Sequence, residues 1–182
     1  MKSISSRAGF LGLVVAALIC QPFRSQAYDM FLSFTGVTGE ATNGLIAIES
    51  LQWGVGRGIS SASGGGTRQA SAPSFSEVTI SKTMDSASPQ LAFQAAGGTT
   101  EVTCVLTIND HNTGNTLYTL TLNGVLISGY SVSSGGDRPS ESLSLNFTKI
   151  TWSYQKLDNA GNKVGNASPT LGWDLAMQKP VQ

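Results

Sequence analysis

The sequence predicts a mainly β protein, either a β-barrel or a β-sandwich, with one short helix. Segments in which apolar and polar residues alternate recur along most of the chain, and this period of two is typical of half-buried strands. Turns rich in Gly, Ser and Asn separate these segments. Only residues 85–98 have the spacing and the boundaries of a helix. A chain of 182 residues is expected to form one domain of this class.

The first 27 residues have the three parts of a secretory signal peptide. Two basic residues precede an apolar run over residues 8–20, and small residues, the last of them Ala27, form a cleavage site. We therefore expect residues 1–27 to be a signal peptide cleaved after Ala27, which leaves residues 28–182 as the mature domain. A retained membrane anchor is the alternative, although the apolar run is short for a bilayer.

The predicted strands follow one another from the start of the mature domain to its end. The segments with a period of two are residues 28–34, 46–55, 74–82, 100–110, 116–134, 141–155 and 170–175. Residues 56–73, mainly Gly, Ser and Ala with two arginines, are too long for an ordinary hairpin turn. Connections of that length in a compact domain are usually functional or disordered. Residues 156–169 form a second long polar connection.

The predicted helix is short and has recognisable ends. Asp85 or Ser86 could cap its N-terminus, and the glycines at positions 97 and 98 would end it. Leu91, Phe93, Ala95 and Ala96 are the apolar residues that precede this stop, and the helix would have about two to three turns.

The segment 116–134 contains an Asn-Gly pair at positions 123–124, which ordinarily signals a type I′ hairpin. Apolar residues keep one parity across the pair, so a kinked continuous strand is equally compatible with the pattern. The residues of that parity are Leu120, Leu122, Leu126, Tyr130 and Val132.

The segment 141–155 alternates with a change of phase. Its apolar residues first occupy odd positions (Leu143, Leu145 and Phe147) and then even positions (Ile150, Trp152 and Tyr154). One extra residue in a strand exchanges its two faces, so the sequence predicts a β-bulge at Thr148-Lys149. Beyond the bulge, the strand would stop packing one core and begin to cover another surface.

Charge and composition exclude several classes of partner. Residues 28–182 keep all 11 acidic residues and lose three of the 11 basic ones, which leaves a formal charge of −3. Without a basic stripe, we expect no binding to nucleic acid and none to a membrane after signal cleavage. Only 12% of the chain is charged, which suits an exported β protein that buries part of its surface against copies of itself.

Catalytic and metal-binding chemistry has few candidates. His111 is the only histidine and stands in a predicted turn, and no serine lies in a Gly-x-Ser-x-Gly elbow. Cys104 shares one strand face with aliphatic residues, so we expect a buried structural thiol. One histidine and one thiol cannot supply the ligands of a zinc site. We therefore expect no enzyme, with no catalytic residue, no cofactor and no metal.

Two alternatives to this expectation rest on other residue types. Glycosidases need only two carboxylates, so an acid such as Glu141 keeps an enzyme open as a hypothesis, although polar strand positions favour a solvated face. Trp53, Trp152 and Trp173 could form a sugar-stacking platform, but tryptophans more often fill the core of a small β domain.

Five blocks of the sequence match a known family in the order in which they occur. They are AYDMFL (27–32), IESLQWGV (48–55), FSEVTISKTMDSASPQL (75–91), VLISGYSVSSGGDRPSESLSLNFTKITWSYQ (125–155) and GWDL (172–175). With them, residues 28–182 resemble the Hcp (haemolysin-coregulated protein) family, which forms the inner tube of the type VI secretion system. The resemblance implies a β-barrel of two packed antiparallel sheets with one short flanking α-helix.

The resemblance also implies partners and places of contact. Six copies would form a ring with a wide channel, rings would stack into a tube, and effector proteins or spike components would be further partners. The long polar loop is the candidate for ring stacking, with Gly56, Arg57, Arg68 and Pro73. The strand after the phase change is the candidate subunit interface, with Thr148, Lys149, Ile150, Trp152 and Tyr154.

The expected signal peptide departs from the pattern of the family, whose members in the secretion system have none. We therefore expect a secreted or periplasmic bacterial protein that is exported by the general route. A monomeric β-barrel binding module outside any type VI apparatus is the alternative function.

Overall fold

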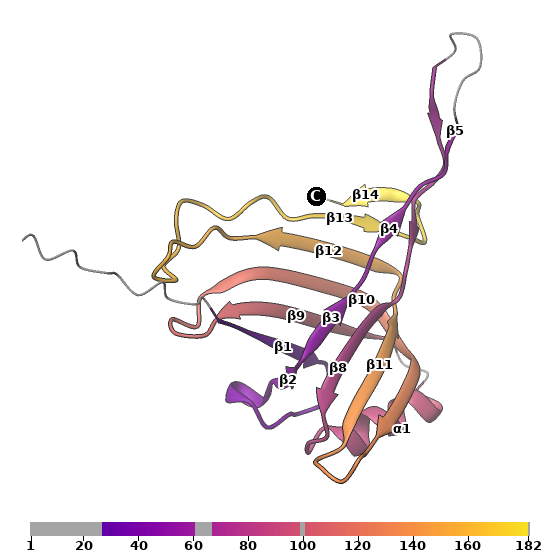
Figure 1. Ribbon diagram of the computed structural model, residues 1–182. Coiled ribbons are helices and arrows are strands. Elements are labelled where there is room, and N and C mark those ends of the chain that lie inside the picture. Colours follow the sequence, from indigo (N-terminus) through magenta and orange to yellow (C-terminus); the bar gives the residue numbers. More distant parts are fainter. Residues whose placement is uncertain (1–26, 61–66, 99–100, 182) are drawn as a thin grey trace, which may run out of the picture.

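The computed structural model describes residues 27–60, 67–98 and 101–181 and confirms a mainly β fold with one helix (Figure 1). Residues 1–26 of the expected signal peptide lie outside these ranges. The strands pair antiparallel and form two sheets that share one long strand, β10 (Thr116–Ser133). Within the described ranges, no helix is both long enough and apolar enough to cross a membrane.

The first sheet has the strand order β2–β1–β9–β10–β12–β13–β14. Its other members are β1 (Tyr28–Phe34), β2 (Ile46–Ile48), β9 (Val102–Asp110), β12 (Lys149–Tyr154), β13 (Leu171–Asp174) and β14 (Lys179–Val181). A 3₁₀ turn, η1 (Thr42–Gly44), precedes β2. The strand β14 was not predicted, because its three residues include a proline and show no alternation.

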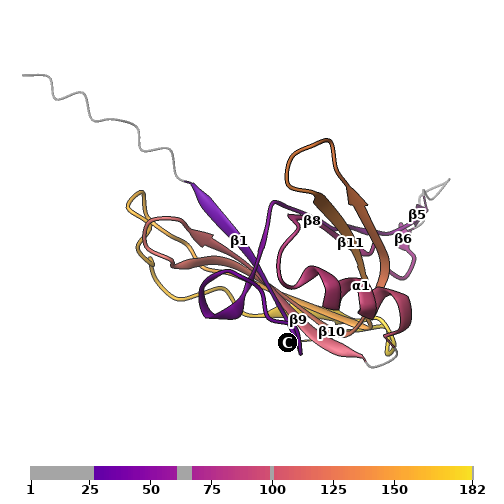
Figure 2. The ribbon, with the colours of Figure 1, turned by 90° about the horizontal axis from the view of Figure 1, so that it is seen from below.

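The second sheet has the strand order β3–β8–β11–β10. It adds β3 (Ser50–Gln52), β8 (Val78–Thr83) and β11 (Ser140–Asn146) to the far half of β10. The helix α1 (Ser88–Gly97) lies across one end of the space between the two sheets (Figure 2). The two sheets connect along β10 and through the consecutive strands β2 and β3, rather than closing as one uninterrupted ladder.

A single core lies between the inward faces of the two sheets. It consists of buried aliphatic residues from both, together with Cys104, which is fully buried as expected. Burial raises the pKa of the Cys104 thiol to about 12, because a thiolate would be poorly solvated there. The residues of the core are Leu32, Phe34, Ile46, Ile48, Val78, Ile80, Ala87, Leu91, Cys104, Leu106, Leu120, Leu122, Val125, Ile127, Leu143, Leu145, Phe147 and Ile150.

The helix differs from the prediction at its start. Its N-cap is Ala87, and no side chain caps it directly, whereas Asp85 accepts a hydrogen bond from the Ala87 N–H (3.0 Å). Leu91 is fully buried, whereas Phe93 is 70% exposed. Residues two apart lie on different faces of a helix, and a short helix at the edge of a core buries only one.

The strand β10 is continuous through Asn123-Gly124, and a bulge lies at this point. The pairing of β10 with β9 shifts between Leu122 and Val125, and Gly124 has a φ of 61°. The kinked continuous strand is therefore confirmed over the hairpin, and the buried residues of β10 change parity at the bulge, from Leu122 to Val125. Leu126 and Val132 are in fact exposed.

The phase change in residues 141–155 occurs opposite this bulge, at the corner where the strands pass from one sheet into the other. The segment is two strands, β11 and β12, which pair with the two halves of β10. The register of this pairing stays the same on passing from β12 to β11. Thr148, at the break, donates its N–H to the Asn123 carbonyl (3.0 Å). The bulge therefore lies in β10 and not at Thr148-Lys149, and the strands turn from one sheet into the other together. Phe147 and Ile150, on either side of the break, both face the same core.

Residues 56–73, expected to be a long loop, are mostly the outer part of a hairpin. Beyond the pair β3–β8, the hairpin continues as β4 (Val55–Gly56) with β7 (Ser74–Phe75) and then as β5 (Ile59–Ser60) with β6 (Gln69–Ala70). We call β4 to β7 the arm, and Figure 1 shows it leaving the body of the molecule. Neither face of its outer part is buried, so no alternation in the sequence could reveal these strands.

Candidate functional site

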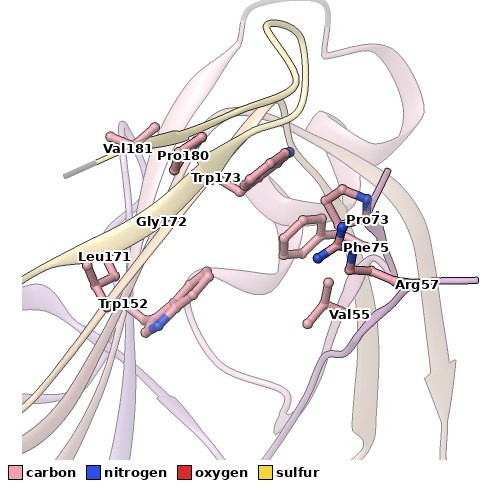
Figure 3. Close-up of a pocket in the computed structure, with 10 residues that line it drawn as sticks. All are labelled: Val55, Arg57, Pro73, Phe75, Trp152, Leu171, Gly172, Trp173, Pro180 and Val181. Atoms are coloured by element: carbon pink, nitrogen blue, oxygen red, sulfur yellow. The ribbon is translucent and has the colours of Figure 1, made fainter. Parts of the chain in front are cut away.

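An apolar groove opens between the root of the arm and the outer strands of the first sheet (Figure 3). Its volume is about 370 Å³. It is lined by Val55, Arg57, Pro73 and Phe75 from the arm and by Trp152, Leu171, Gly172, Trp173, Pro180 and Val181 from the strands β12, β13 and β14. Arg57 carries the only charge among these residues. A surface of this kind marks a place of contact with another molecule.

An aromatic contact joins the root of the arm to Trp152, which lines the groove. The rings of Trp53, between β3 and β4, and Trp152 of β12 lie 5.5 Å apart between centroids, at an interplanar angle of 36°. Such a tilted pair fixes both the distance and the direction of the two segments. Trp53, Trp152 and Trp173 all pack against the core as partly buried residues, which agrees with the more common role of tryptophan in small β domains.

Serine side chains stabilise the arm where its strands cannot bury apolar residues. The Gly58 N–H donates to Ser71 Oγ (2.9 Å), and the Gly54 N–H donates to Ser76 Oγ (2.8 Å). Arg57 Nε donates to the Ser71 carbonyl (2.9 Å), so its guanidinium is held near the groove. Ser71 and Ser76 thus join the two sides of the hairpin through their hydroxyls.

The structure brings three of the expected site residues together and separates the rest. Arg57 and Pro73, expected to serve ring stacking, line the groove together with Trp152, expected at a subunit interface. Gly56 lies in the strand pair β4–β7 at the root of the arm, and Arg68 lies further out on the arm. Neither residue lines the groove.

The other residues of the expected interface strand lie apart from the groove. Thr148 stands at the corner, and Lys149 pairs with Asp174 in the sheet. Ile150 is fully buried in the subunit's own core, whereas Tyr154 is 48% exposed at the far end of β12. Of the expected interface residues in β12, only Ile150 is thus fully buried within the subunit.

Sequence reasoning missed the C-terminal half of the groove. Trp173 and Leu171 are close in sequence to the predicted last strand, but Pro180 and Val181 come from β14. The signal that could have found them is the Pro-Val pair at positions 180–181, which follows the predicted strand 170–175 at the distance of a hairpin return.

A buried charged cluster lies beneath the N-terminus of α1. Lys82 Nζ donates to Asp85 Oδ1 (2.7 Å), the Thr83 carbonyl (2.8 Å), Glu141 Oε2 (2.9 Å) and Ser88 Oγ (3.1 Å). Tyr130 donates its hydroxyl to Glu141 Oε1 (2.7 Å). Glu141 is 1% exposed, so the expectation that it lies on a solvated strand face was wrong.

The electrostatics of this cluster favour structure over catalysis. Burial alone would raise the pKa of Glu141, but hydrogen bonds from Lys82, Tyr130 and Ser88 outweigh it and lower the pKa below its ordinary value. Burial and the hydrogen bond to Glu141 raise the pKa of Tyr130 to about 12. Lys82 forms ion pairs with both Asp85 (2.7 Å) and Glu141 (2.9 Å), so the cluster ties β8, β11 and the segment before α1 together.

His111 lies in a turn as expected, and its Nδ1 is 2.9 Å from Asp29 Oδ2 in an exposed pair. In the described part of the chain, no three His, Cys, Asp or Glu residues come close enough to hold a metal ion. The groove, rather than any polar cluster, is thus the candidate site.

Comparisons with known proteins agree on one family. The chain matches the family described as "Type VI secretion system effector, Hcp" over residues 31–154. It is similar to the solved structure of a type six secretion system protein, with 26% identity and a TM-score of 0.78, over 85% of this chain and 100% of that one. No curated protein matches the sequence.

Two further solved structures share the fold at lower identity. Hcp1 from Salmonella typhimurium is 21% identical, with a TM-score of 0.67, over 85% of this chain and 99% of its own. A type VI secretion system effector from Yersinia pestis is 20% identical, with a TM-score of 0.61, over 80% and 99%.

Proposed function

The chain belongs to the Hcp family of the type VI secretion system, and from this premise we propose that it is a structural protein that assembles into hexameric rings. The family is one of secreted tube proteins rather than enzymes. The observation that carries the proposal is the apolar groove, which the described part of the chain leaves uncovered. An uncovered apolar surface of this kind is stabilised when another copy of the chain buries it.

The proposed ring places the groove at the contact between neighbouring subunits. A closed ring requires a heterologous contact, in which two different surfaces of each subunit meet. The groove would be one of these surfaces. Rings built in this way would stack into tubes, and their channel would hold effector cargo, as the family resemblance implies.

Two substitutions in the groove are expected to separate the subunits. Val55 is 52% exposed and Leu171 is 45% exposed, so the double variant Val55→Glu, Leu171→Glu should fold normally. Buried in a contact, its two carboxylates would lack partners, and we expect the ring to dissociate at least tenfold more readily, which corresponds to about 1.4 kcal/mol. Sedimentation velocity over a concentration series measures this.

The control is Val164→Glu, which changes a residue that is 40% exposed and does not line the groove. It should assemble like the wild type. If the double variant assembles as tightly as this control, the groove is not the contact between subunits.

The proposed location is outside the cytoplasm, in the periplasm or beyond the cell. It is supported by the signal-peptide pattern of residues 1–27. Mass spectrometry of the chain recovered from the periplasm or the medium tests this, and the expected N-terminal residue is Tyr28. A chain that keeps Met1 would contradict the cleavage.

A further inference from the structure

The expected cleavage site lies at the point where the folded sheet begins. Ala27 immediately precedes β1, and Tyr28 is the first residue of that strand. The peptide bond between them is the one that cleavage after Ala27 would break. In the folded domain, the His111 N–H donates a hydrogen bond to the Ala27 carbonyl (3.0 Å). The carbonyl of the expected cleavage site is therefore already bound within the fold.

The residues that follow this bond are held in the first sheet. The strand β1 lies between β2 and β9, and its ladder with β9 begins at Tyr28, opposite Asp110 (Figure 1). Asp29 Oδ2 lies 2.9 Å from His111 Nδ1, which ties the same strand end to the turn after β9. Met30 pairs with both neighbouring strands and packs against the core. The start of β1 can therefore leave the sheet only if these contacts open together.

Hydrolysis of the bond needs a free strand. A peptidase binds the residues around a bond as an extended segment that pairs with the enzyme. During the reaction, the oxygen of the attacked carbonyl moves against hydrogen-bond donors of the enzyme. Overall, the hydroxyl of water joins the Ala27 carbonyl carbon, the bond to the Tyr28 nitrogen breaks, and this nitrogen takes up the proton. The Ala27 oxygen cannot enter such a site while it is bonded to His111.

The contacts that cover the bond come from a distant part of the chain. The nearby strand β2 pairs only with residues 30–32 and does not reach the bond. The contacts that do reach it come from positions 110 and 111, at the end of β9 and in the turn after it. Where export is coupled to synthesis, at about 5–20 residues per second, position 111 follows position 27 after on the order of ten seconds. During this interval the bond is uncovered.

We propose that the pairing of β1 with β9, through the contact between Ala27 and His111, closes the Ala27–Tyr28 bond to the signal peptidase, so that cleavage has to precede folding. This inference rests on the proposed export and cleavage after Ala27. The order of events is then translocation of the unfolded chain, cleavage, folding and assembly. A copy that folds before it meets the peptidase keeps residues 1–27.

Cleavage of the full-length chain in detergent by a purified bacterial signal peptidase tests this order. Mass spectrometry measures the rate of cleavage after Ala27 for the folded wild type and for Leu106→Asp, whose buried charge in β9 prevents folding, as circular dichroism checks. We expect the folded protein to be cut at least about tenfold more slowly, because it first has to open locally. Equal rates would overturn the proposal and leave the cleavage itself in place. If neither chain were cut at this bond, the cleavage on which the proposal rests would be wrong.

Two substitutions at position 111 test the contact itself. His111→Ala removes the ion pair with Asp29 and keeps the backbone N–H, whereas His111→Pro removes both. Asp110 belongs to β9 and is extended, which is the conformation that favours a following proline. The control is Asn112→Ala, an exposed change in the same turn. Folded His111→Pro should be cut about two- to tenfold faster than this control, as the loss of one hydrogen bond predicts, with His111→Ala between them. If His111→Pro and the control were cut at the same rate, the contact between Ala27 and His111 would not close the bond, and the proposal would be wrong.

Discussion

Replacing Lys82 by methionine is expected to lower the free energy of unfolding by about 3–5 kcal/mol, because it leaves buried carboxylates without their cation. Lys82 and Glu141 are both buried to 1% exposure or less, and Lys82 is the only cation that bonds to Glu141 in the described structure. The substitution keeps the volume of the side chain and removes only its charge and its hydrogen bonds. Chemical denaturation at neutral pH measures the change.

The matched control is Lys179→Met, on the exposed strand β14, which should change the free energy of unfolding by no more than about 0.5 kcal/mol. Adding Glu141→Gln to Lys82→Met should recover part of the loss, since the uncompensated buried charge is then gone. A Lys82→Met protein as stable as the Lys179→Met control would contradict the account of the cluster.

The same cluster gives the stability a pH dependence of known sign. The pKa of Glu141 is lower in the folded chain than its ordinary value of 4.5. The stabilisation from its charged form is therefore fully present above pH 4.5 and is lost as the pH falls through the folded value. Glu141→Gln should be less stable at neutral pH and should lose less stability on acidification than the wild type.

Replacing Gly124 by alanine is expected to cost about 2–4 kcal/mol of unfolding free energy. Gly124 has a φ of 61°, which an L-residue with a side chain adopts only with strain. A Cβ at this position would also overlap Thr148, whose hydroxyl donates to the Asn123 carbonyl (3.2 Å). The variant thus disturbs the corner at which both paired strands pass from one sheet into the other.

A double-mutant cycle separates the two causes. In a Thr148→Gly background the overlap is absent, so Gly124→Ala should cost only the strain of the backbone, about 1–2 kcal/mol. Gly129→Ala, in the same strand, has a negative φ and an ordinary contact with Ser144, and should change the stability by less than about 1 kcal/mol. If Gly124→Ala and Gly129→Ala lowered the free energy of unfolding equally, the description of the corner would be wrong.

Much of the fold could be predicted because its strands are half-buried and long. The first strand matches the prediction at both ends, at Tyr28 and Phe34, and Cys104 lies where its aliphatic neighbours place it. The helix was found from its glycine stop, but the exposure of Phe93 depends on which of its faces meets β10. The sequence of this ten-residue helix alone does not show which face that is.

The features that sequence reasoning missed depend on contacts between distant segments. Lys82 and Glu141 share the parity of the buried Ile80 and Leu143, but only the pairing of β8 with β11 shows that they meet as a buried pair. The groove joins residues near position 55 to residues near position 180, and only the folded sheet order brings them together. The corner at Gly124 was visible as an Asn-Gly pair, but its effect on the facing strand required the pairing register.

The molar mass of the purified protein in solution, measured by light scattering after gel filtration, tests the central claim most directly. The account predicts a mass six times that of one chain, unchanged over a wide range of concentration. A mass of one chain at every concentration would contradict the ring. The family and the fold would still stand, and the groove would then be the ligand site of a monomeric binding module.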